Sequence, residues 1–406
     1  MQNGSAWALR LSLAVFGGKP VTIRCYELWS GQEPFVVNLD CKDRIMPINQ
    51  HCYMPVLKWR QGEYQALLRL EDAQKDRIVP LIEVTPPDFD FETQTPSKTI
   101  DEHVVSFATR IQKKWGSRHA LLDCGLLPPA TRMADGRHPL AHLFDECTTL
   151  NASLIPVTGL DRDDAYQHAV HEIHTWSGHG AALRCSLEDA IDPDFDTNVY
   201  LLCETIGIGP NELDIVLDLE SPNFDPQDDL IALISAALSG AAIFNSARSL
   251  TIVGASFPDS MGSVTGPLQL WPRREWLLYK ALLGALGPNI RRPGFGDYAI
   301  SAPTIAQGDM RLLKPSATIR YTVDDGWLIA KGNNVRDNGF GQYRTCSGHI
   351  TGSAYYLGAA FSPGSNYVAG CQVGTENTGN LTTWRWVGTN HHITKVVHDL
   401  ATFYGI

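Results

Sequence analysis

The sequence lacks the short motifs that identify a mechanism on their own. It has no GxGxxG after a predicted strand, no P-loop, no HExxH and no GxSxG pattern. The enzyme classes that depend on these motifs are therefore not indicated. Chemistry has to be sought in residues that only the tertiary structure brings together.

Other features are absent or scarce. No apolar run approaches the roughly 20 residues needed to cross a bilayer, so no spanning helix is expected. The nine cysteines form no CxxC pair, which is typical of reduced thiols in a cytoplasmic protein. Lys and Arg number 33 against 44 Asp and Glu, and the net charge of −11 excludes a broad electrostatic attraction for a phosphate backbone.

The first 45 residues have no periodic pattern that continues into the rest of the chain. We expect residues 1–45 to be a poorly ordered N-terminal leader or extension and residues 46–406 to form a single domain. A secretory signal is not expected, because Arg10 interrupts the apolar stretch from Trp7 to Phe16. A chain that starts at Met46 should melt like the full chain.

From Tyr53 onward one unit recurs: a short run of Val, Ile and Leu, a polar turn, and an amphipathic helical stretch. This alternation predicts parallel strands joined by helical crossovers. Eight strands that are apolar on both faces favour a single (β/α)8 TIM-like barrel over the alternative, an open doubly wound α/β sheet. The predicted strands are Tyr53–Lys58, Ile78–Val84, His119–Cys124, Ser153–Thr158, Gly180–Cys185, Leu213–Leu219, Ser249–Gly254 and Asp297–Ser301.

The rhythm changes after the eighth predicted strand. Two β-like runs, Thr318–Val323 and Trp327–Lys331, flank an Asp-Gly pair and predict a β-hairpin insertion. The stretch from Gly374 to Thr389 is loop-like in composition. A last helix is predicted over Ile393–Phe403, with His391 and His392 at its start.

Charged residues stand at the carboxyl ends of several predicted strands. In a parallel barrel these ends form the mouth, where active sites are found. Burying an unpaired charge costs several kcal/mol, so charges inside strand runs are paired or functional. The candidate catalytic residues are Lys58, Glu83, Asp123, Arg184, Asp218 and Glu220.

The first hypothesis is a metal-dependent phosphodiesterase or nuclease-like hydrolase. Glu83, Asp123 and Asp218 would hold a Mg²⁺ or Mn²⁺ ion, because carboxylate oxygens suit hard divalent cations. Lys58 and Arg184 would bind a phosphate-containing or nucleotide ligand, and Glu220 would position water.

The alternative hypothesis is a non-catalytic binding or sensor component. In it, the same charged residues form a salt-bridge network that closes the top of the barrel, and a protein partner binds elsewhere. The acidic balance and the missing mechanism motifs favour this interpretation.

Several stretches together resemble the phage-associated Beta protein family. They are MPVLKWRQGEYQAL (54–67), RIVPLIEV (77–84), LIPVTGLDRD (154–163), FGDYAI (295–300) and TTWRWVGTNHHIT (382–394), and the resemblance covers nearly everything from Met46 to the end. It implies a phage or mobile-element context, with a phage or host protein as partner, and it supplies no biochemical activity.

Overall fold

The computed structural model describes residues 48–258, 260–305 and 312–406, so the expectation for residues 1–45 lies outside the described residues. Eight parallel strands close into a barrel in the order β1-β11-β9-β8-β7-β6-β5-β2. The predicted barrel is confirmed, and the open sheet is excluded. The barrel strands are β1 (Tyr53–Leu57), β2 (Leu81–Glu83), β5 (Ala120–Asp123), β6 (Leu154–Thr158), β7 (Ala181–Ser186), β8 (Leu213–Asp218), β9 (Ser249–Gly254) and β11 (Gly294–Asp297).

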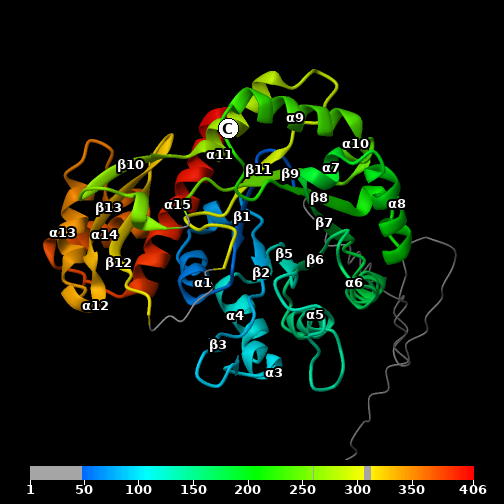
Figure 1. Cartoon of the computed structure of the whole chain (residues 1–406), viewed down its shortest axis with the longest axis horizontal. Coiled ribbons are helices and arrows are strands. Elements are labelled where there is room, and N and C mark those ends of the chain that lie inside the picture. Colours follow the sequence, from blue (N-terminus) through cyan, green and yellow to red (C-terminus); the bar gives the residue numbers. More distant parts are fainter. Residues whose placement is uncertain (1–47, 259, 306–311) are drawn as a thin grey trace, which may run out of the picture. The chain divides into compact units, whose positions relative to one another are not determined.

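Helices follow the strands and surround the barrel (Figure 1). The pattern of residues 100–115 predicts one helix with Thr99 as its N-cap and Glu102 in a capping box; the structure has this cap and box, but the helix is broken into α3 and α4. The helices around the barrel are α1 (Gln61–Leu68), α2 (Asp72–Lys75), α3 (Ile100–Val104), α4 (Phe107–Lys114), α5 (Pro139–Thr149), α6 (Asp164–Ser177), α7 (Leu187–Ile191), α8 (Phe195–Ile206), α9 (Gln227–Gly240), α10 (Ile243–Ser246) and α11 (Arg274–Ala285).

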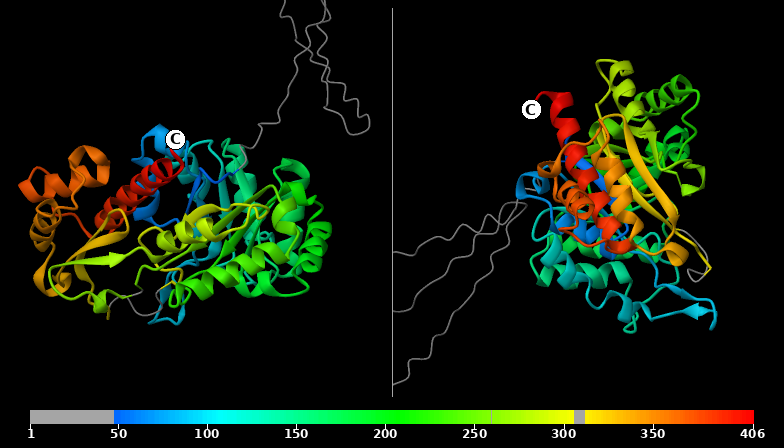
Figure 2. Two further views of the ribbon diagram at one scale, coloured as in Figure 1. Left: turned by 90° about the horizontal axis from the view of Figure 1, so that it is seen from above. Right: turned by 90° about the vertical axis from the view of Figure 1, so that its left-hand side faces the viewer.

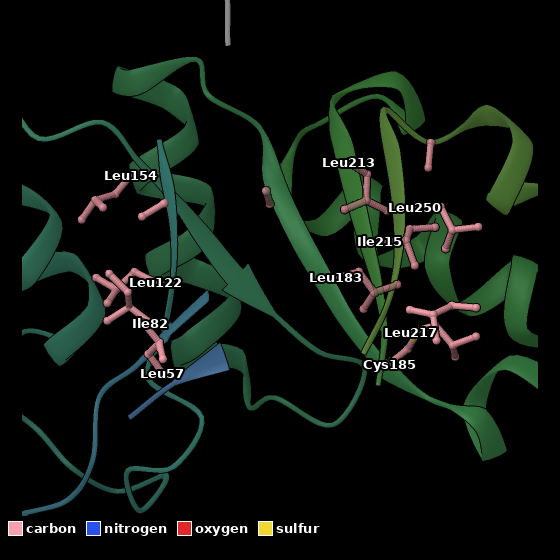
Figure 3. Close-up of a cluster of buried hydrophobic side chains, with 14 of the residues drawn as sticks. Leu57, Ile82, Leu122, Leu154, Leu183, Cys185, Leu213, Ile215, Leu217 and Leu250 are labelled. Atoms are coloured by element: carbon pink, nitrogen blue, oxygen red, sulfur yellow. The ribbon is translucent and has the colours of Figure 1, made fainter. Parts of the chain in front are cut away.

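Alternate residues of each barrel strand face the surrounding helices. Ile82, Leu122, Leu183 and Leu217 belong to this outer core, which fills the space between strands and helices (Figure 3). Because successive side chains of a strand point to opposite faces, their neighbours in sequence point into the barrel.

A second layer of structure adjoins the barrel. Strand β10 (Leu268–Pro272) and the predicted hairpin, β12 (Ser316–Thr322) and β13 (Gly326–Asn334), form an antiparallel sheet with its own apolar core. Helix α15 (Leu381–Tyr404) contacts α1 of the barrel and β12 of this sheet (Figures 1 and 2). The remaining helices of this layer are α12 (Val335–Asn338), α13 (Gln342–Thr351) and α14 (Pro363–Val373).

The predicted eighth strand, Asp297–Ser301, begins too late in the chain. The structure places β11 at Gly294–Asp297, and the backbone of Ala299 turns away with a φ of +53°. Its glycines hide the strand from propensity-based prediction. They are needed there, because a Cβ on Gly296 would lie 2.7 Å from the carbonyl oxygen of Met54.

The predicted start of the last helix, Ile393, is also wrong. Helix α15 begins at Leu381, so the prediction of a loop up to Thr389 fails over its second half. Asn380 caps the helix by accepting a hydrogen bond from the backbone N–H of Thr383. The two adjacent histidines, His391 and His392, therefore lie inside the helix and not at its start.

Two further expectations concern the membrane and the thiols. None of the helices in the described ranges is both long and apolar enough to cross a bilayer. The cysteines in the same ranges are all free, as Cys124, Cys147 and Cys185 in the barrel illustrate.

Candidate functional site at the barrel mouth

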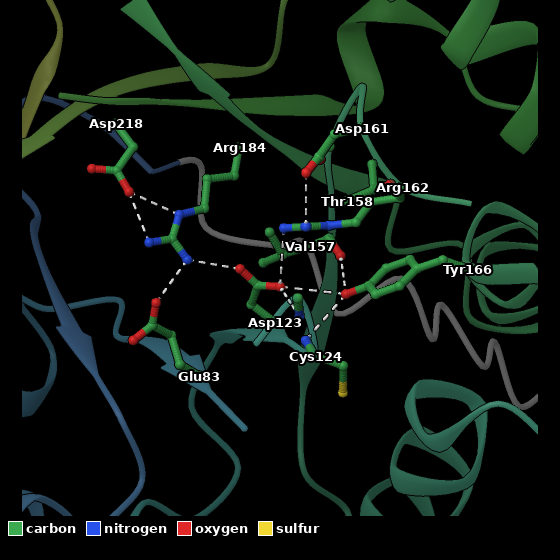
Figure 4. Close-up of polar contacts among 12 residues, drawn as sticks. Glu83, Asp123, Cys124, Val157, Thr158, Asp161, Arg162, Tyr166, Arg184 and Asp218 are labelled. Atoms are coloured by element: carbon green, nitrogen blue, oxygen red, sulfur yellow. Dashed lines mark hydrogen bonds and ion pairs between the residues drawn. The ribbon is translucent and has the colours of Figure 1, made fainter. Parts of the chain in front are cut away.

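The side chain of Arg184 lies at the centre of the barrel mouth (Figure 4). Its Nη1 donates to Oε1 of Glu83 at 2.9 Å and to Oδ2 of Asp123 at 2.8 Å. Its Nε donates to Oδ2 of Asp218 at 2.8 Å, and its Nη2 donates to the hydroxyl of Tyr298 at 2.6 Å. We call these five residues the Arg184 cluster.

The alternation of side chains explains why these residues meet. Glu83, Asp123 and Asp218 each follow an outward-facing residue of the apolar core, so they point into the barrel. Glu83 and Asp123 are paired in register on β2 and β5, which puts them at one height. Arg184 on β7 reaches across the interior to both strands.

Burial and charge act together on this cluster. Burial lowers the pKa of Arg184, but Tyr298 and the three carboxylates outweigh that effect and raise it well above its usual value. The guanidinium therefore stays charged. Burial also raises the pKa of Glu83 above its usual value, against the opposing effects of Arg184 and Lys58.

Lys58 lies beside Glu83, as its position at the end of β1 predicts. Its Nζ is 3.5 Å from Oε2 of Glu83 and donates to the carbonyl oxygen of Ala302 at 3.0 Å. That Glu83 oxygen has no hydrogen-bond partner, and the side chain is 1% exposed. Both Lys58 and Arg184 therefore form ion pairs and hydrogen bonds with groups inside the protein.

Asp123 is held by a second cation that sequence reasoning did not assign to the site. Nη2 of Arg162 lies 3.8 Å from Oδ1 of Asp123, and the backbone N–H of Gly125 donates to the same oxygen at 2.7 Å. Arg162 also lies 3.3 Å from Asp161. The signal available in the sequence is the charged run of residues 161–164 directly after β6, whose carboxylates also suit the start of a helix.

Glu220 and Tyr298 follow the ends of β8 and β11. The backbone N–H of Glu220 donates to Oδ1 of Asp218 at 2.9 Å, and its φ of +51° turns the chain sharply at the mouth. The hydroxyl of Tyr298 donates to Oδ2 of Asp218 at 2.5 Å. Tyr298 was missed because the predicted eighth strand started too late.

The mouth opens into a cavity of about 1620 Å³. Five of the six predicted site residues line it: Glu83, Asp123, Arg184, Asp218 and Glu220. Lys58 is not among the lining residues. Two exposed aromatic side chains, Phe89 and Phe91, also line it, although no motif in the sequence marked them.

The predicted metal ligands Glu83, Asp123 and Asp218 do come together, but around a protein cation. Within the described ranges, no three or more His, Cys, Asp or Glu side chains form a group that could hold a metal ion. The guanidinium of Arg184 takes the position between the carboxylates that the sequence analysis gave to Mg²⁺ or Mn²⁺.

A second buried polar cluster lies on the outer face of β11, the face that Asp297 shares with Phe295 of the outer core. Asp297 at the end of β11 accepts from the hydroxyl of Tyr53 at 2.5 Å, and Nε2 of His392 hydrogen-bonds with its Oδ2 at 3.0 Å. Nδ1 of His392 hydrogen-bonds with Thr322 of β12 at 2.9 Å. We call these four residues the Asp297 cluster. It joins the barrel to the adjoining sheet.

Comparison with known proteins places the chain by sequence and by fold. The sequence profile of a family described as Beta protein matches residues 53–398. The crystal structure of triosephosphate isomerase from Bartonella henselae covers 60% of this chain with 90% of its own, at 12% identity and a TM-score of 0.31. No curated protein sequence matches the chain. The closed strand order itself, and not this distant likeness, carries the assignment of the barrel.

Proposed function

The chain belongs to the Beta protein family, and from its barrel mouth we propose that it is a binding or sensor component that takes up a positively charged ligand. The observation that carries this proposal is the charge of the cavity wall. Among the residues that the structure describes, eight carboxylate side chains line the cavity against three guanidinium groups. The carboxylates are Glu83, Asp88, Asp90, Asp123, Asp161, Asp189, Asp218 and Glu220; the guanidinium groups belong to Arg60, Arg162 and Arg184.

The excess of negative charge belongs to the rim of the cavity. On the floor, Lys58, Arg162 and Arg184 offset three carboxylates through the ion pairs described above. The rim carboxylates, among them Asp88 and Glu220, give the entrance its negative potential. A cavity wall with an excess of negative charge attracts cationic ligands and repels phosphate groups.

Arg184 supports the same conclusion. Each nitrogen of its guanidinium contacts an acceptor inside the protein, so binding an external phosphate would require breaking charge-assisted hydrogen bonds. Arg184 therefore acts as an internal counter-ion that preorganises the floor. In the phage or mobile-element context implied by the family resemblance, the partner would be a phage or host protein in the cytoplasm.

The second candidate remains metal-dependent phosphodiester hydrolysis at the mouth. It is favoured by one observation: Glu83, Asp123 and Asp218 each have an oxygen within 2.9 Å of the Arg184 guanidinium. Carboxylate oxygens are the ligands of hard divalent ions, and such an ion would have to displace Arg184. On this hypothesis Asp218→Ala abolishes Mn²⁺-stimulated cleavage of bis-p-nitrophenyl phosphate or DNA while the chain stays folded. Retained cleavage would rule the hypothesis out.

A thermal-shift screen distinguishes the two functions. The probes are Mg²⁺, Mn²⁺, ATP, inorganic phosphate, spermidine and agmatine. A ligand at 100 times its Kd stabilises the folded state by about 2.7 kcal/mol. We expect the organic cations to raise the Tm and ATP and phosphate to leave it unchanged.

Rim variants make the screen specific to the mouth. Asp88→Asn with Glu220→Gln should reduce the shift caused by spermidine, whereas Glu204→Gln on the outer helix α8 should not. A shift with ATP and none with either organic cation would contradict the proposed binding function.

A further inference from the structure

The loop after β2 carries a small hairpin at the cavity wall. Strands β3 (Phe89–Asp90) and β4 (Thr95–Pro96) pair antiparallel, and the hairpin projects beyond its neighbours (Figure 2). Its turn is held by its own hydrogen bonds: the backbone N–H of Glu92 donates to Asp90 at 2.8 Å, and the side chain of Gln94 donates to Phe91 at 2.6 Å. The hairpin is thus an ordered part of the wall.

Two aromatic rings of this hairpin face the cavity while staying exposed to solvent. Phe89 is 47% and Phe91 38% exposed, and both line the cavity. Their ring centroids are 5.1 Å apart with planes at 77°, so the rings form a corner of two walls. Leaving these two phenylalanines partly exposed gives up part of the free energy that their full burial would contribute. Their position is therefore suited to a ligand that covers them.

Carboxylates surround this corner. Asp88 and Asp90 flank Phe89 in the sequence, and all three line the cavity. At the floor, Oε2 of Glu83 accepts no hydrogen bond, but Nζ of Lys58 lies 3.5 Å from it. This carboxylate is already paired inside the protein, so recognition of a cation depends on the aromatic corner and the carboxylates beside it.

We propose that the β3–β4 hairpin recognises the ligand through cation–π contacts, and that the ligand is a guanidinium or an alkylated ammonium group. The inference rests on the binding function proposed above and specifies its ligand class. Aromatic faces attract cations, and the attraction grows as the cation is less hydrated. Guanidinium and alkylated ammonium groups are weakly hydrated and bring apolar surface to the rings. A divalent metal ion keeps its water and gains little from them.

The test is isothermal titration calorimetry on the full chain. The probes are ethylguanidinium, tetramethylammonium, Mg²⁺ and the peptide acetyl-Gly-Arg-Gly-amide. The first two report a free small-molecule ligand, and the peptide reports an arginine side chain of a partner. We expect binding of the organic cations with higher affinity than Mg²⁺.

Leucine variants isolate the aromatic contribution. Phe89→Leu and Phe91→Leu keep the apolar bulk and remove the ring, so each should weaken binding of the organic cations by about fivefold. Trp176→Leu is the matched control, because Trp176 is 51% exposed on α6 and outside the cavity lining. The Tm of each variant confirms that it is folded.

The outcomes separate this inference from the function on which it rests. Unchanged affinity in both leucine variants, or Mg²⁺ binding that is tighter than that of the organic cations, would overturn the aromatic recognition and leave a cation-binding mouth intact. If no cation binds to the unchanged protein, the proposed function fails and the inference fails with it.

Discussion

Two clusters of buried charge lie at the carboxyl ends of the barrel strands, and they differ in what covers them. The Arg184 cluster faces a cavity of about 1620 Å³. The Asp297 cluster is covered by α15 and β12, and His392 and Thr322 are fully buried. Strand-end charge therefore borders a cavity in one cluster and joins the barrel to the adjoining sheet in the other.

The electrostatics of the two clusters differ as well. In the Arg184 cluster one guanidinium offsets three carboxylates, and each contact crosses between strands. In the other cluster, burial raises the pKa of Asp297, but the charge of His392 and hydrogen bonds outweigh it and hold the pKa below its usual value. Asp297 is thus stabilised as an anion, whereas burial raises the pKa of Glu83 in the Arg184 cluster.

The largest expected effect is that of removing the central cation. Arg184→Met leaves three buried carboxylates without their counter-ion, which should lower the free energy of unfolding by about 3–5 kcal/mol in urea denaturation. Arg110→Met on the exposed face of α4 should change it by less than about 0.5 kcal/mol. A loss below about 1 kcal/mol for Arg184→Met would show that the cluster does not stabilise the barrel. Stability restored by Mn²⁺ in this variant alone would favour the metal hypothesis.

The next effect tests whether the Asp297 cluster is purely structural. Asp297→Asn keeps the shape of the side chain but replaces an acceptor oxygen with an N–H₂ group that faces other donors. We expect the free energy of unfolding to fall by about 2 kcal/mol. Because the cluster faces no cavity wall described above, agmatine should bind this variant as well as it binds the unchanged protein. A weaker affinity in calorimetry would show that the two clusters are coupled.

Glu275 interacts electrostatically with Asp297, so it allows a pH-dependent test of stability beside the Asp297 cluster. Burial and the nearby Asp297 raise the pKa of this carboxyl from 4.5 to about 7. The folded chain therefore keeps a proton that the unfolded chain releases, so this contribution to stability is full below pH 4.5 and is lost as the pH rises to about 7.

Glu275→Gln removes that titration. Relative to the unchanged protein, the variant should gain about 2 kcal/mol of unfolding free energy between pH 5 and pH 8. Glu204→Gln on the exposed face of α8 provides the control, for which the difference should be flat. A flat difference for Glu275→Gln would place its pKa near the ordinary value.

The smallest expected effect concerns the phenol of the Arg184 cluster. Tyr298→Phe removes one hydrogen bond to Asp218 and one from Arg184, at a cost of about 1 kcal/mol. The ring stays, and so does the ion pairing, so the Tm should fall by only a few degrees. A loss as large as that of Arg184→Met would mean that the phenol, and not the cation, organises the floor.

Much of the barrel could be predicted because its signals are local. Seven of the eight strands were placed by their runs of Val, Ile and Leu, and the hairpin by its Asp-Gly turn. Strand β11 was misplaced, since Gly294 and Gly296 have no side chain to contribute to such a run. The start of α15 was missed because its first turns are rich in threonine and tryptophan.

The site could be predicted only in part. Counting positions along each strand identified Glu83, Asp123, Arg184 and Asp218 as residues at one end of the barrel. It could not show that Arg184 would reach Glu83, which lies 101 positions away in the sequence. It also gave no reason to look at Phe89 and Phe91, because a two-residue strand leaves no periodic pattern.

By itself, therefore, the sequence determined the fold class and the end of the barrel at which the charges gather. Both follow from the recurring order of apolar run, polar turn and amphipathic helix, each of which is set by a few neighbouring positions. Only the tertiary structure decided which charges pair, which are covered, and where a cavity remains. Those outcomes depend on groups that meet across the barrel and on loops packed over its mouth, and no local pattern encodes such distances.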